Sequence, residues 1–115
     1  ANIIWSHFFG RGIVDPVDDV RISNPPSNKE LLEELGKKLA GYGFDKKKLV
    51  RDICNSRTYQ LSATPNPTNQ LDEAYFSHSY VRRLRAEVLL DTITRITGTE
   101  DRFGLSPAGT RAVQI

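Results

Sequence analysis

The chain has 115 residues, of which 38% are hydrophobic and 26% are charged, a composition typical of a single globular domain that argues against extended disorder. Sixteen basic and fourteen acidic residues leave a net charge of +2, too small to attract a polyanion by charge alone, so nucleic acid is not an expected partner. The apolar runs are too short to cross a bilayer, and we expect no membrane span.

The first predicted helix covers residues 3–9 and ends at Gly10 or Gly12. His7 lies among aromatic neighbours on this helix, and we expect it to be packed and hydrogen-bonded. Residues 11–26 form a connecting loop, because its prolines forbid regular helix. Aliphatic side chains are expected to anchor the loop to a core: Ile13, Val14, Val17, Val20 and Ile22.

The next two helices are expected to form a hairpin. Ser27 and Glu30 have the S-x-x-E spacing of a capping box, which predicts a helix start at that point. Leucines follow at helical spacing, and Gly41 or Gly43 provides the stop. Asp45 can cap the third helix, which ends at residues 55–56. Its apolar face is expected to be buried: Leu49, Val50, Ile53 and Cys54.

The sequence patterns that predict the remaining elements are weaker, except for the pattern of the last helix. Residues 57–61 are expected to be an extended connection and not part of a sheet, because prolines follow closely. A short helix is expected within residues 69–80, and a clear one from Arg85 to Thr97, ended by Gly98. We therefore predict an all-α fold of about four to five short helices joined by long anchored loops, with no substantial sheet.

The chain is expected to be one helical segment, residues 1–115, cut from a longer domain of a multidomain parent. It contains no methionine, its first residues are already amphipathic, and its last residues are apolar. Neither end has the cap or charged tail that closes many domains.

Several kinds of chemistry lack the residues that they require. A covalent haem needs C-x-x-C-H, and structural zinc needs four Cys or His ligands, whereas this chain has Cys54, His7 and His78. No metal or cofactor is therefore expected in this segment. Asp15, Asp18 and Asp19 lack the spacing of an EF-hand loop, and turn capping or pairing with Arg11 or Arg21 is the simpler interpretation.

An arginine cluster precedes the last helix. Arg82, Arg83 and Arg85 lie where positive charge opposes the helix dipole, so they are candidates for binding a carboxylate or phosphate of a partner. The alternative is pairing within the helix, because Arg83 with Glu87, and Asp91 with Arg95, are four residues apart.

Four sets of motifs occur in a fixed order along the chain. They are IWSHFFGRGIV at residues 4–14 with DD at 18–19 and NPPS at 24–27, ICNSRTYQLS at 53–62, RRL and AEVLLD at 82–91, and GTRA at 109–112. In these motifs the chain resembles the planctomycete-specific, cytochrome-associated domain called PSD-one, a family of unknown function. The resemblance implies a large exported parent protein, in a cell-envelope or periplasm-like compartment. It also implies that a c-type cytochrome module, with its haem, can occur elsewhere in the parent.

Two functions remain open from the sequence. The favoured one is a non-catalytic scaffold or interaction module whose partners are other domains of the same polypeptide, including a c-type cytochrome module. The alternative is part of the active site of an exported polymer-degrading hydrolase or oxidoreductase. That alternative predicts that a set of polar residues converges on one pocket: His7, Asp15, Asp18, Asp19, and Arg57 or Tyr59.

Overall fold

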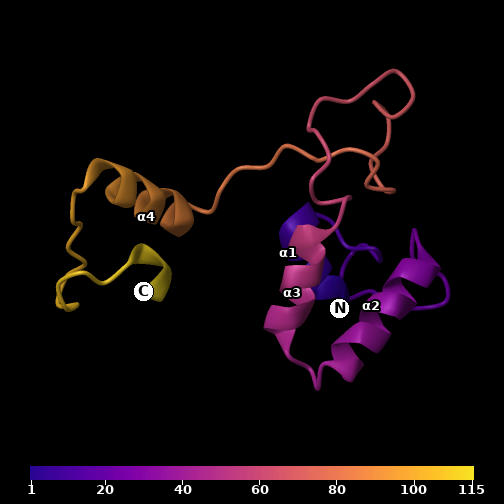
Figure 1. Cartoon of the computed structure of the whole chain (residues 1–115), viewed down its shortest axis with the longest axis horizontal. Coiled ribbons are helices and arrows are strands. Elements are labelled where there is room, and N and C mark those ends of the chain that lie inside the picture. Colours follow the sequence, from indigo (N-terminus) through magenta and orange to yellow (C-terminus); the bar gives the residue numbers. More distant parts are fainter. The chain divides into compact units, whose positions relative to one another are not determined.

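The computed structural model describes residues 1–115, which divide into two compact units, Ala1–Val81 and Arg82–Ile115 (Figure 1). The chain forms no strand, and a single isolated bridge joins Arg21 to Asn24. The helices are α1 (Asn2–Phe9), α2 (Lys29–Gly41), α3 (Lys46–Asn55) and α4 (Ala86–Thr97), followed by the 3₁₀ turn η1 (Ala112–Gln114). The predicted all-α class is confirmed, whereas the derivation from a longer domain stays a prediction.

The core of the first unit joins α1, α2 and α3 to the segment that follows them. Trp5 stacks on Phe9 with ring centroids 4.0 Å apart, and Phe76 meets both rings at steep angles. The buried cluster consists of Trp5, Phe9, Ile13, Leu35, Leu49, Ile53 and Phe76. The buried positions of α2 and α3 thus lie on the apolar faces that their spacing predicts.

Asn2 ties the first part of the loop to α1. This buried side chain donates to the carbonyls of Val14 (2.8 Å) and Val17 (3.0 Å), and it accepts from the amides of Ile13 (2.8 Å) and Val14 (3.1 Å). Because these backbone groups are removed from water, one side chain satisfies donors and acceptors that would otherwise be costly to bury. The turn of the chain after α1 is therefore fixed by Asn2.

The predicted anchoring of this loop is right only for its first part. Ile13 and Val14 are buried, but Val20 is 69% exposed and Ile22 is fully exposed. The amide and hydroxyl of Ser27 both donate to the Ile13 carbonyl, so the chain returns to the core without using Val20 or Ile22.

The helical hairpin forms as predicted, with one correction at its start. Asn28, not Ser27, caps α2, because its side-chain oxygen accepts from the Leu31 amide at 2.9 Å. Asp45 caps α3 as expected, accepting from the amides of Lys47 and Lys48. Gly43, at φ +60°, supplies the left-handed residue that ends α2.

The segment after α3 differs from its prediction in two places. Residues 57–61 form turns and not an extended connection, and no helix forms within residues 69–80. The Asp72 carboxylate accepts hydrogen bonds from the amides of Ala74, Tyr75 and Ser77, and these bonds stabilise a turn. Phe76 is buried, and its backbone lies in the left-handed region at φ +57°, which interrupts any helix.

The second unit begins with α4, which the sequence predicts almost residue for residue, including its end at Gly98 (φ +68°). This unit has no buried side chain. None of the helices of the chain has the length and the hydrophobicity to cross a membrane.

Candidate interaction site

Asp91 of α4 holds the end of the second unit in place. Its carboxylate accepts hydrogen bonds from the backbone amides of Ala112 (2.6 Å) and Val113 (3.3 Å) at the start of η1. The Gln114 side chain accepts from the Arg111 amide at 2.9 Å and completes this turn. The ion pair of Asp91 with Arg95, which their spacing allows, does not form, because the Asp91 oxygens serve backbone donors.

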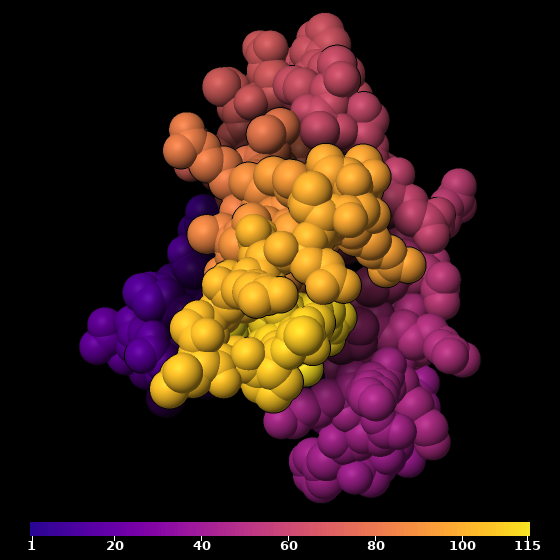
Figure 2. All heavy atoms as spheres, turned by 90° about the vertical axis from the view of Figure 1, so that its left-hand side faces the viewer, coloured from indigo at the N-terminus to yellow at the C-terminus, as the bar shows by residue number.

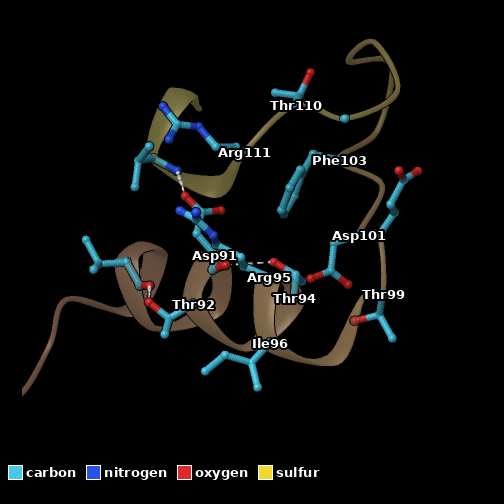
Figure 3. Close-up of a pocket in the computed structure, with 14 residues that line it drawn as sticks. Asp91, Thr92, Thr94, Arg95, Ile96, Thr99, Asp101, Phe103, Thr110 and Arg111 are labelled. Atoms are coloured by element: carbon cyan, nitrogen blue, oxygen red, sulfur yellow. Dashed lines mark hydrogen bonds between the residues drawn. The ribbon is translucent and has the colours of Figure 1, made fainter.

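A hollow of about 610 Å³ lies between α4, the loop after it and the residues around η1 (Figure 3). The Phe103 ring enters it from the loop, while Asp91, Thr94 and Arg95 face it from α4. Basic and acidic side chains both line it, since Arg95 and Arg111 share it with Glu100 and Asp101. The hollow is thus mixed in charge, with one aromatic wall.

The apolar residues of α4 are largely exposed. Val88, Leu89 and Ile93 are 37%, 45% and 47% exposed, and Ile96 is 80% exposed. Figure 2 shows the atoms of α4, in orange, beside those of the C-terminal residues, in yellow, within the second unit. The periodicity of α4 predicts a buried face, yet the structure leaves most of that face open to contact.

The net charge of the chain resides in the second unit. Residues 82–115 contain six arginines and four acidic residues, whereas basic and acidic residues are equal in number in residues 1–81. Arg85 pairs weakly with Glu87 at 3.9 Å, in place of the predicted pairing of Arg83 with that residue. Arg82, Arg83 and Arg85 are all exposed immediately before α4.

The acidic residues of the first loop take the simple roles that their sequence context suggests. Asp15 pairs with Arg11 at 3.5 Å and Asp19 with Arg21 at 2.8 Å, while Asp18 is exposed.

His7 is exposed, so the prediction of a packed histidine is wrong. The buried face of α1 runs through Asn2, Trp5 and Phe9, and His7 points away from it.

The other candidates of the first unit are Arg57 and Tyr59. Arg57 is exposed in a turn, and the Tyr59 ring packs edge-on against the rings of Phe8 and Phe9, with centroids 5.9 Å away in both cases.

A second hollow, of about 380 Å³, lies at the α2–α3 hairpin. Neither of these two hollows is lined by a residue that the active-site alternative requires, and that alternative stays a prediction.

The chain brings together no three His, Cys, Asp or Glu side chains that could hold a metal ion. Cys54 is partly exposed, not buried as predicted, because the buried face of α3 centres on Leu49 and Ile53 and leaves Cys54 at its edge.

Sequence reasoning missed the two side chains that shape the second unit. Asp91 was considered only as an ion-pair partner, because its backbone contacts join residues more than twenty positions apart. Phe103 lies in a glycine- and proline-rich stretch, and the signal that could have pointed to it is the presence of a lone aromatic residue in an otherwise polar loop. Neither contact has a local sequence pattern.

Comparison with models of known protein families finds a match. The model of the family described as "Protein of unknown function (DUF1553)" matches residues 1–111. No curated protein and no solved structure matches the chain.

Proposed function

The chain belongs to the DUF1553 family of proteins of unknown function, and on that premise we propose that it is a non-catalytic interaction module of a larger protein. Its contact surface is the second unit, and its partner is another domain of the same polypeptide. The resemblance described above favours a c-type cytochrome module of an exported parent protein as that domain, with haem in the partner and not in this segment.

The observation that carries the proposal is the lack of any buried side chain in residues 82–115. Chains below about 40 residues rarely fold alone without a disulfide, a metal or a partner, because they bury too little apolar surface. Here α4 leaves Leu89, Ile93 and Ile96 substantially exposed. A partner that covers this strip supplies the missing hydrophobic stabilisation.

The chemistry of the partner follows from the arginines. Arg82, Arg83 and Arg85 are exposed at the surface and place positive charge at the N-terminal end of α4, where it opposes the helix dipole. A partner surface with an apolar strip beside acidic groups satisfies both features, because the planar guanidinium group suits carboxylates.

Substitution of Ile96 tests the apolar contact. Ile96 is 80% exposed, so Ile96→Asp removes no buried contact but places a charge in the proposed interface. We expect this change in the parent protein to weaken the docking of the partner domain by at least about tenfold, as measured by binding between the separately expressed parts. The matched control is Ile22→Asp, at a fully exposed isoleucine of the first unit. Equal binding by the Ile96 and Ile22 variants would contradict the proposal.

Charge reversal tests the arginines separately. Arg82→Glu is expected to leave the circular dichroism spectrum unchanged and to reduce the association rate more than it raises the dissociation rate, because exposed charges mainly steer encounter. This reduction in association rate should become smaller as salt is added. If the Arg82→Glu variant binds like the wild type at low salt, the arginine cluster is not part of the interface.

A further inference from the structure

Residues 81–85 lead into α4 and have no regular secondary structure. The side chains of residues 81–86 are all exposed, including the apolar Val81 (87%) and Leu84 (59%). The backbone is extended at Arg85, with φ −61° and ψ +147°, and its carbonyl accepts the hydrogen bond of the Leu89 amide at the start of α4. The chain therefore presents an exposed backbone segment immediately before the helix.

Arg82 and Arg83 form a basic pair within this segment. The chain has two other runs of adjacent basic residues, all lysine, at residues 37–38 in α2 and residues 46–48 in α3. An endopeptidase binds its substrate in extended form, and helical hydrogen bonds hold the backbone of both lysine runs in another form. The arginine pair is thus the one basic pair of this chain that lies outside a helix.

A break in this segment disturbs no buried contact of the first unit. Every member of the buried cluster, from Trp5 to Phe76, precedes residue 81. The contacts of the Asp91 carboxylate with the amides of Ala112 and Val113 all lie after it. Hydrolysis between residues 82 and 85 therefore separates α4 from the first unit without opening the core.

We propose that the bond between Arg83 and Leu84 is a cleavage site for an endopeptidase specific for paired basic residues. Exposed segments outside regular structure are preferred sites of proteolysis, because little structure must open before the enzyme can bind them. The two guanidinium groups supply the charge that acidic subsites of such an enzyme recognise. The C–N bond is hydrolysed by one water molecule, so that Arg83 gains a terminal carboxylate and Leu84 gains a terminal ammonium group.

The cut detaches residues 84–115, with the surface proposed for interaction, from the folded first unit. This consequence rests on the proposed function, whereas the cleavage site itself does not. The same arginines are assigned to the interface with the partner domain, so docking and cleavage exclude each other. The partner domain therefore protects the bond while it is docked.

The test is limited proteolysis of the full chain by a subtilisin-type serine endopeptidase that cuts after paired basic residues, followed by mass spectrometry. We expect the first products to be residues 1–83 and 84–115, with the fluorescence of the buried Trp5 unchanged by the cut. Arg82→Gln and Arg83→Gln should each slow the cut by at least about tenfold, because each removes a charged contact with the enzyme.

The matched control is Lys37→Gln, which breaks the basic pair of α2 in the same way and should leave the rate unchanged. Circular dichroism of the uncut variants establishes that each is folded. The proposal would be overturned by a wild-type chain that resists the enzyme, by a first cut within α2 or α3, or by an Arg83→Gln variant that is cut as fast as the wild type.

Trypsin, which needs a single basic residue, tests the accessibility of the segment apart from the paired motif. It should cut first within residues 82–85, and a first cut after Arg57 or Arg102, which are also exposed, would count against the proposal.

Proteolysis of the parent protein tests the docking separately from the cleavage site. The parent should be cut after Arg83 at least about tenfold more slowly than the chain alone, because a bound partner domain covers the arginines. Equal rates of cleavage after Arg83 would contradict the proposed docking and support the cleavage site.

Discussion

Gly12 occupies a position in the first unit that no other residue can fill without displacing the backbone. A Cβ atom there would lie 2.2 Å from the Val14 carbonyl oxygen, 2.9 Å from a Val17 methyl group and 3.0 Å from Asn2 Nδ2. The closest of these is a backbone atom, and it belongs to the turn that Asn2 holds. The requirement for glycine here is therefore steric and does not come from an unusual backbone angle.

Gly12→Ala is expected to lower the free energy of unfolding of the first unit by about 3 kcal/mol, the upper end for overpacking. Urea unfolding followed by the fluorescence of Trp5, the only tryptophan, measures this change. The control is Gly36→Ala, at an exposed site of α2 with nothing within 4 Å, which should stabilise the chain by about 0.5–1 kcal/mol. Similar effects of the two substitutions would contradict the steric argument.

Asp72 organises the turn before Phe76. Burial raises the pKa of its carboxyl, but hydrogen bonds from the Ser77 hydroxyl and from the amides of Tyr75, Ser77 and Ala74 outweigh burial and hold the pKa well below the ordinary value of 3.8. A carboxyl whose pKa is lower in the folded state stabilises the fold when it is ionised. Its contribution is complete above pH 3.8 and is lost as the pH falls from there through the lower folded pKa.

Asp72→Asn is therefore expected to destabilise the first unit at pH 7 and progressively less as the pH falls below the ordinary pKa. Urea unfolding at pH 7, 4 and about 2.5 measures the difference in the free energy of unfolding between the wild type and the variant. If this difference stays constant over the pH range, the ionised carboxylate is not what stabilises the turn.

At the scale of elements, local patterns predicted most of the helices. Apolar spacing located all four α-helices and glycine stops marked the ends of three of them, because these signals depend on residues within one or two turns. The cap of α2 was misplaced by one residue, since Ser27 bonds to Ile13, which is fourteen positions earlier. The helix expected within residues 69–80 does not form, because the left-handed backbone of Phe76 interrupts it.

Asn28→Ala is expected to remove the cap of α2 and to lower the free energy of unfolding by about 1 kcal/mol. Asn28→Asp, which keeps an accepting oxygen, should retain the wild-type value or exceed it, because a negative charge is favourable at a helix N-terminus. Denaturant unfolding of both variants gives the comparison. If Asn28→Asp loses as much stability as Asn28→Ala, the side chain does not act as the cap.

At the scale of the whole molecule, the two units differ in how they are held together. The first has a core of buried aromatic and aliphatic side chains, whereas the second depends on hydrogen bonds that the Asp91 carboxylate accepts from backbone amides. Helix amphipathicity does not distinguish them, because both contain amphipathic helices. The candidate interaction surface could therefore be predicted only in part. The arginine cluster is visible in the sequence, but the exposure of Leu89, Ile93 and Ile96 depends on tertiary packing, which has no local sequence pattern.

A fragment of residues 1–81 is expected to unfold cooperatively, and a fragment of residues 82–115 is expected to have little helix in water, because an isolated helix of this length is marginal. Circular dichroism of the two fragments at several temperatures checks both statements. A stable, cooperatively melting second fragment would mean that it needs no partner to cover α4.

The two units also divide the basic residues by type. All six lysines lie between Lys29 and Lys48, while every basic residue of the second unit is arginine. Amine-directed reagents, including common biotin and fluorophore esters and the aldehyde surfaces of biosensors, therefore react with the first unit alone. The protein can be attached through the first unit with the second left chemically untouched.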